Sequence, residues 1–76
     1  MKLRPIASNM TEIETSKAIV LFSYSTPVAA RIDNGTRWDY VRTNKFWSVT
    51  TSKHINKWLN GSEARQVDQS FLDGLV

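Results

Sequence analysis

The sequence predicts an α+β fold: a small antiparallel sheet of four to five strands with one packed helix. Two patterns lead to this prediction: several early segments alternate apolar and polar residues, and a later segment repeats its apolar residues at helical spacing. The chain has 76 residues, so we expect a single domain over residues 1–76, near the lower size limit for a self-supporting core. A homodimer or a bound partner would add stability to so small a core.

The first three strands are expected before residue 33. Residues 10–15 alternate apolar and polar side chains, as a half-buried strand does. Residues 18–25 are apolar on both faces, so they should form the central strand, covered on two sides. Pro27 interrupts the pattern, and we therefore expect residues 28–32 to form a bulge or an edge strand.

Two further strands are expected between residues 33 and 50. Residues 33–36 read Asp-Asn-Gly-Thr, a sequence that favours a tight hairpin turn. The next segment, residues 37–43, alternates and places Trp38 and Tyr40 on one face. Asn and Lys at positions 44 and 45 then permit a second turn into a strand at residues 46–50.

A helix is predicted at about residues 52–60. Ile55, Trp58 and Leu59 share one of its faces, which should pack on the central strand. The N-cap is expected among the three hydroxyl residues at positions 50–52. Gly61 suits the left-handed position after the helix. Beyond it we expect one short C-terminal helical turn, held by Phe71, Leu72 and Leu75.

Positive charge is concentrated in one part of the chain. The net charge is +3, but residues 37–57 alone carry five cations against Asp39, a local net charge of +4. Lys53 and His54 stand at the predicted helix start, where acidic side chains would suit the helix dipole better. Either they are solvated surface residues, or they join the hydroxyls and free backbone N–H groups in holding an anion such as a phosphate.

The basic segment, with Trp58 directly after it, also contains five of the eight aromatic residues, which fits a surface for single-stranded nucleic acid. Core packing is the alternative use for these rings. Adjacent strand residues point to opposite faces, so Phe46 and Trp47 cannot both enter one core layer. The predicted anion or nucleic-acid site comprises Arg42, Lys45, Trp47, Thr51, Ser52, Lys53, His54 and Lys57.

Several function classes lack support in the sequence. Without cysteine the chain has no disulfide or thiolate metal site, and neither metal-ligand spacing nor a glycine-rich phosphate loop occurs. We therefore expect no enzyme, no catalytic residue, no metal and no cofactor. Neither a secretory signal nor a membrane-spanning apolar run is visible, so we expect a cytoplasmic protein without a membrane partner.

Two segments carry a family resemblance: FSYSTPVAA at residues 22–30, and W-S-x-T-T-x-K-H-I-x-K-W-L at residues 47–59. With these, the chain resembles a group of small uncharacterised proteins of tailed bacteriophages, over most of residues 2–76. The resemblance implies expression in an infected bacterium, and hence the host-cell cytoplasm. It carries over no functional residue.

The leading prediction is a non-enzymatic binding module that holds nucleic acid through the basic surface at the start of helix 52–60. The runner-up is a phage inhibitor that binds and occludes a host protein, such as an anti-defence or anti-CRISPR-type factor. A third interpretation is a sponge for a small phosphorylated signal. Salt separates the first two, because phosphate contacts weaken steeply as salt rises and an apolar protein interface does not.

Overall fold

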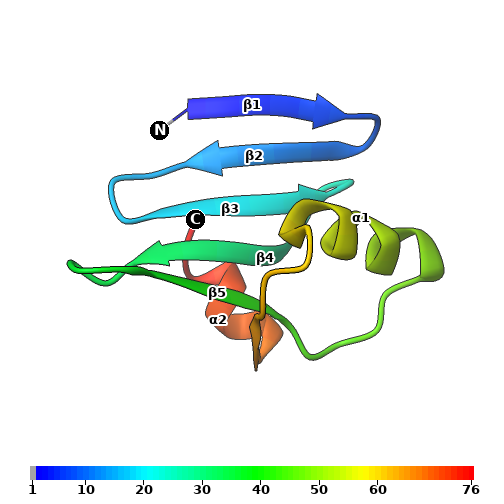
Figure 1. Ribbon diagram of the computed structural model, residues 1–76. Coiled ribbons are helices and arrows are strands. Elements are labelled where there is room, and N and C mark those ends of the chain that lie inside the picture. Colours follow the sequence, from blue (N-terminus) through cyan, green and yellow to red (C-terminus); the bar gives the residue numbers. More distant parts are fainter. Residues whose placement is uncertain (1) are drawn as a thin grey trace.

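The computed structural model describes residues 2–76, which form one six-stranded sheet and two helices (Figure 1). The strands lie across the sheet in chain order, from β1 at one edge to β6 at the other. The elements are β1 (Lys2–Ala7), β2 (Met10–Glu14), β3 (Ala18–Ser23), β4 (Thr26–Asp33), β5 (Trp38–Thr43), α1 (Val49–Leu59), β6 (Arg65–Val67) and α2 (Gln69–Asp73).

The sheet is mixed, because its last strand runs parallel to its neighbour. Strands β1 to β5 form an antiparallel meander with short turns. Strand β6 is parallel to β5, since α1 carries the chain back across the sheet between them. The predicted α+β class is confirmed, but the sheet has six strands and is not purely antiparallel.

Three strand predictions differ from the structure. Strand β1 was not predicted, although Lys2, Leu3 and Arg4 alternate polar and apolar side chains before Pro5. Residues 28–32 do not form an edge strand, because β4 pairs with both β3 and β5. The bulge expected after Pro27 does occur, as a register shift opposite Leu21 and Phe22. Residues 46–50 form a loop and the first turn of α1 instead of a strand, so β6 takes the expected edge position.

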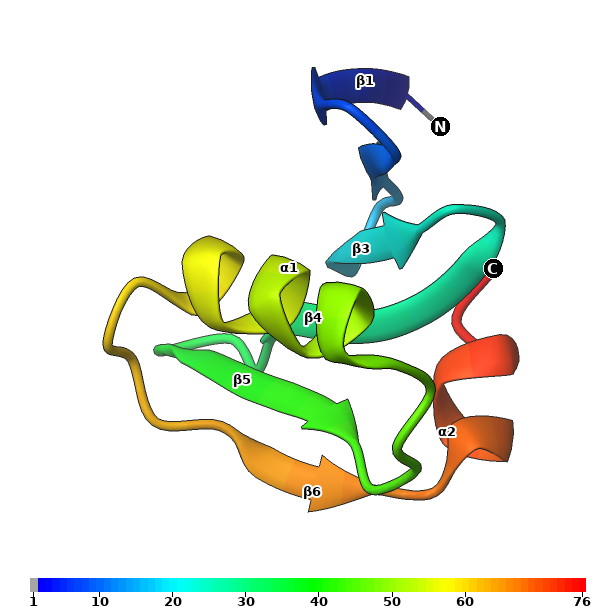
Figure 2. The ribbon, with the colours of Figure 1, turned by 90° about the vertical axis from the view of Figure 1, so that its right-hand side faces the viewer.

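Two hydrophobic clusters form the core, one on each face of the sheet. Helix α1 covers one face and α2 the other, and β1 lies at the edge away from both helices (Figures 1 and 2). The cluster under α1 contains Met10, Leu21, Val28, Ala29, Ile55 and Leu59. The cluster under α2 contains Ala18, Val20, Ala30, Val41 and Leu72. Strand β3 contributes to both, which confirms that it is central and covered on two sides.

Helix α1 packs as its apolar spacing predicts. Ile55 and Leu59 are buried against β3 and β4, whereas Trp58 is only half-buried at the edge of the cluster. The helix ends where expected, and Gly61 after its C-cap is left-handed as predicted, with φ 86°. The C-cap Asn60 is left-handed as well, with φ 50°. Neither helix within residues 2–76 has the length and hydrophobicity of a membrane-spanning segment.

The side-chain amide of Gln69 joins α2 to the rest of the fold. Its Oε1 accepts hydrogen bonds from Thr43 Oγ1 at 2.9 Å and from Trp47 Nε1 at 3.1 Å. Its Nε2 donates to the backbone oxygen of Pro27 at 2.6 Å and to the Asp73 carboxylate at 3.1 Å. All four hydrogen-bonding positions of the amide are therefore used, and they connect α2 with β4, β5 and the loop before α1.

Candidate nucleic-acid interface

The start of α1 lies three residues earlier than the sequence predicts. Ser48 is the N-cap, because its Oγ accepts a hydrogen bond from the Thr51 backbone N–H at 3.1 Å. The prediction of an N-cap at residues 50–52 is therefore wrong. Lys53 and His54 consequently lie in the second turn, where the backbone N–H groups are bonded within the helix and the dipole acts weakly. They do not flank the free N–H groups.

Thr51 and His54 point inward and form a polar group with Ser23 at the end of β3. Ser23 Oγ lies 3.0 Å from Thr51 Oγ1 and 2.8 Å from His54 Nδ1. Ser23 and Thr51 are 2% and 5% exposed, and the Tyr24 ring lies 5.9 Å from the imidazole of His54. The hydroxyls and imidazole thus satisfy one another under the helix, and this part of the predicted site is internal.

A serine hydroxyl beside an imidazole is also the first half of a nucleophile–base pair. Ser23 is too deeply buried to meet a substrate, and no carboxylate among residues 2–76 is hydrogen-bonded to His54. The same residues contain no cluster of three or more potential metal ligands. The group therefore fits a structural role, in which it fixes the position of α1 on the sheet.

The other predicted residues of α1 lie on its outer side. Lys53 and Lys57 are exposed, and Ser52 is half-buried. Arg42, on β5, reaches the helix and donates from Nη1 to the Asn56 side-chain oxygen at 3.3 Å. We define the basic surface as five residues, of which the last two are described next: Arg42, Lys53, Lys57, Lys45 and Trp47.

The loop before α1 places a lysine on an exposed ring. Lys45 Nζ lies 4.1 Å from the centre of the Trp47 ring, which suits a cation–π contact. Trp47 is 41% exposed, and Phe46 beside it is 70% exposed. The two rings do not both enter one core layer, as expected, but the reason is that the segment is a loop and not the predicted strand.

Trp47 also borders a hollow at the start of α1. The hollow has a volume of about 200 Å³; Thr26, Trp47 and Ser48 line it, and the buried residues Ser23 and Thr51 form part of its wall. The indole nitrogen of Trp47 is bonded to Gln69, so the ring cannot turn freely. The Trp47 ring, which Lys45 contacts and which borders the hollow, therefore has a fixed orientation.

Sequence reasoning missed a second group of rings and cations on the α1 side of the sheet. The guanidinium of Arg31 lies 4.1 Å from the centre of the Trp38 ring, and Trp38 is 49% exposed. Tyr40 meets Trp58 edge to face, with ring centres 6.1 Å apart. Trp38 and Tyr40 were expected to share a face. The pairing of Arg31 with Tyr40 was not expected, because it depends on the register of β4 on β5.

Glu12 ties the edge of the sheet to α1. It accepts hydrogen bonds from Trp58 Nε1 at 2.6 Å and from Arg4 at 2.7 Å. Burial alone would raise the pKa of Glu12, but these two hydrogen bonds and the positive charges of Arg4 and Arg31 hold the pKa below its usual value. The bonded carboxylate therefore stays ionised.

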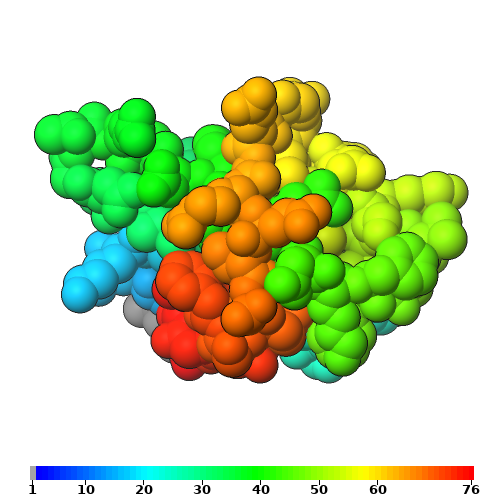
Figure 3. Space-filling model, turned by 90° about the horizontal axis from the view of Figure 1, so that it is seen from below, coloured from blue at the N-terminus to red at the C-terminus, as the bar shows by residue number. Residues whose placement is uncertain are grey.

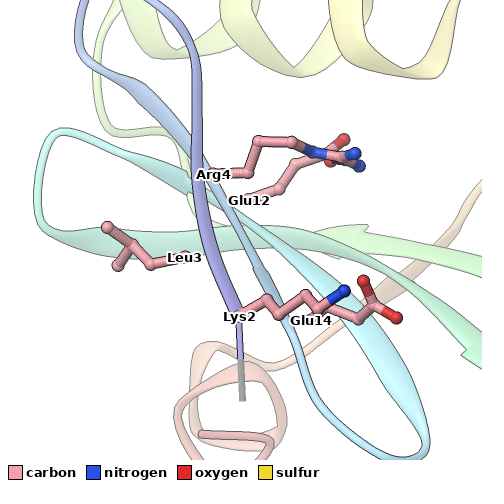
Figure 4. A pocket seen from close by; sticks show the side chains of 5 residues that line it. All are labelled: Lys2, Leu3, Arg4, Glu12 and Glu14. Atoms are coloured by element: carbon pink, nitrogen blue, oxygen red, sulfur yellow. Dashed lines mark hydrogen bonds and ion pairs between the residues drawn. The ribbon is translucent and has the colours of Figure 1, made fainter.

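The edge of the sheet presents different chemistry on its two sides. Figure 4 shows Lys2, Arg4, Glu12 and Glu14 on one side of the first two strands, with Leu3 pointing to the other. The four charged residues line an open hollow of about 360 Å³. Because two cations oppose two carboxylates there, this hollow is close to neutral and does not extend the basic surface.

Comparison with protein families identifies the chain but not its activity. Residues 1–74 match the model of the family of unknown function DUF8033. The chain belongs to the DUF8033 family. No curated protein and no solved structure matches it. The family description gives no source and no partner, so the resemblance to phage proteins stays a prediction.

Proposed function

We propose that this DUF8033 protein binds nucleic acid through the basic surface. The observation that supports this most directly is the absence of any carboxylate from residues 44–60, a segment that exposes Lys45, Lys53 and Lys57. Lysines in a segment that contains no carboxylate attract the phosphates of a polyanion and release its counterions, although Asp68 bonds to Asn44 next to Lys45.

The aromatic rings add a second kind of contact to this surface. Trp47 and Phe46 are exposed beside Lys45, so one loop presents a cation and two rings. Proteins that bind single strands use this combination, because rings stack on bases while cations follow the phosphates. The partly exposed Ser52 hydroxyl and the Asn56 amide lie on the same helix and can donate to phosphate oxygens.

Salt titration tests the proposal. We expect a labelled oligonucleotide to bind at about 50 mM salt, with an affinity that falls linearly with salt on logarithmic axes. Lys53→Gln and Lys57→Gln should each reduce the slope by roughly 0.7–0.9. Lys17→Gln is the matched control, since Lys17 is exposed in the turn between β2 and β3 and should leave the slope unchanged. No binding at low salt, or the same loss in the control, would refute the proposal.

Docking on a host protein is a second candidate, favoured by the edge strand. Leu3 and Ile6 on β1 are 67% and 41% exposed, and neither helix covers them. Exposed apolar residues of this kind can join a protein interface. Lys2, Arg4 and Pro5 on the same strand oppose simple strand pairing, however. A partner protein that stays bound at high salt, and whose binding is abolished by Leu3→Ser, would favour this function.

A further inference from the structure

Three side chains form a row on the α1 side of β5. Trp38, Tyr40 and Arg42 occupy alternate positions, so they share a face at spacings of about 7 Å. We call them the β5 row. At one end Arg31 covers part of Trp38, and at the other end Arg42 reaches Asn56 on α1.

The aromatic part of this row is held rigidly. Arg31 on the interior strand β4 fixes the Trp38 ring, yet 49% of Trp38 remains exposed. Tyr40 is held edge to face against Trp58, whose indole nitrogen is bonded to Glu12. Rings that are already in place lose little conformational entropy when a planar ligand stacks on them.

Both arginines next to these rings have an unused donor. The Nε atoms of Arg31 and Arg42 are buried and have no hydrogen-bond partner among the residues that the structure describes. A buried donor without a partner is costly, and in native proteins it usually marks the place of a water, an ion or a ligand. One of these donors belongs to Arg42 within the β5 row and the other to Arg31 beside Trp38, so the row has hydrogen-bonding capacity left for a polar ligand.

A groove beside β5 gives such a ligand room. It has a volume of about 510 Å³, and its walls come from the β4–β5 hairpin and from residues 63–65. In Figure 3 the hairpin, in green, projects at one end of the molecule, and the orange segment lies across the middle. Arg37 and Arg65 face Asp39 and Glu63 in this groove, so its charge is balanced. Balanced polar walls beside a tryptophan suit a neutral base better than a phosphate.

Tyr40 connects the groove with the basic surface. It lines the groove and contacts Trp58, which follows Lys57 in the chain, and Arg42 of the basic surface lies two residues after it on β5. A strand whose phosphates lie along Lys53 and Lys57 can therefore place its bases over β5. In a duplex the bases are already paired and stacked, so their faces are closed to these rings.

We propose that the ligand of the basic surface is single-stranded nucleic acid, and that one of its bases stacks on Trp38 in the groove beside β5. This inference rests on the proposed function and adds to it the form of the nucleic acid and a second contact region. It assigns bases to the β5 row and phosphates to the lysines of α1.

The experiment compares a single-stranded oligothymidine of about twenty nucleotides with a duplex of equal length, by anisotropy at low salt. We expect the single strand to bind tighter, and Trp38→Ala to weaken its binding by about tenfold or more. Trp38→Phe keeps a ring and should restore most of the affinity. The salt slope should stay unchanged in both Trp38 variants, because stacking releases no counterions. Thermal melts of both show whether the fold is intact.

The possible failures are distinguishable. If no oligonucleotide binds, the proposed function fails. If binding occurs and depends on Lys53 and Lys57, but Trp38→Phe and Trp38→Ala both bind like the wild type, only the stacking inference fails. Tighter binding of the duplex would also overturn it and would indicate that α1 itself contacts a double helix.

Discussion

The two helices cover opposite faces of one sheet, and they do so with different chemistry. Helix α2 is five residues long and fills its face with the fully buried side chain of Leu72. Helix α1 buries Ile55 and Leu59, but it also covers a polar group and exposes lysines. Substitutions under α2 should therefore change stability alone, whereas the α1 side combines residues for stability with residues available for binding.

Leu72→Ala should have the largest effect and would break the α2 face. Leu72 is completely buried among Val20, Ala30 and Val41, so its loss leaves a cavity that costs about 2–5 kcal/mol. That loss is a large part of the stability of a domain this small. Urea denaturation measures it, with Phe71→Ala as the control because Phe71 is 42% exposed. Equal midpoints for the two variants would contradict the assigned role of Leu72.

Ser23→Ala should have an intermediate effect on the α1 face. The substitution leaves Thr51 Oγ1 and His54 Nδ1 without their shared partner, at a cost of about 1–3 kcal/mol. Thermal melts measure the loss, and Ser25→Ala in the exposed hairpin turn is the control. Oligonucleotide affinity of the folded fraction should not change, because Ser23 is internal. A loss of affinity without a loss of stability would mean that Ser23 contacts the ligand.

Glu12→Gln should have the smallest effect, visible mainly in acid. The folded pKa of Glu12 lies below its unfolded value of 4.5, so ionised Glu12 stabilises the fold above that pH. This contribution is lost as the pH falls below 4.5 toward the folded pKa. Because Arg4 is 67% exposed, the contribution should not exceed about 1 kcal/mol. Melting temperatures should therefore fall less between pH 7 and acid in Glu12→Gln than in the wild type. If the melting temperatures of Glu12→Gln and the wild type fall equally with pH, the assigned pairing of Glu12 with Arg4 and Trp58 is contradicted.

The sequence predicted the elements whose signals are local. Strand β3 was recognised from two apolar faces, the β4–β5 hairpin from its Asp-Asn-Gly turn, and α1 from the spacing of Ile55 and Leu59. The errors occurred where tertiary contacts outweigh local preference. Residues 46 and 47 look like a strand because of their aromatic side chains, but the Gln69 bond to Trp47 holds them as a loop.

The site was predicted in part, for a related reason. Exposed lysines on α1 follow from helical periodicity, so Lys53 and Lys57 were found. Thr51 was expected as a possible cap, but the helix begins at Val49, so Thr51 lies one turn before Ile55 on the buried face and His54 lies in the second turn. Arg31 beside Trp38 requires the register of β4 on β5, which no local pattern specifies.

The position of Leu72 in the chain has a consequence for biosynthesis. Strands β1 to β5 pair in the order in which they are translated, so the meander can begin to form early. Its α2 face stays open until residue 72 has been made, which takes about 4–14 s at 5–20 residues per second. Until then Val20, Ala30 and Val41 lack their contact with Leu72. The nascent chain therefore presents an apolar sheet surface to chaperones until translation reaches Leu72.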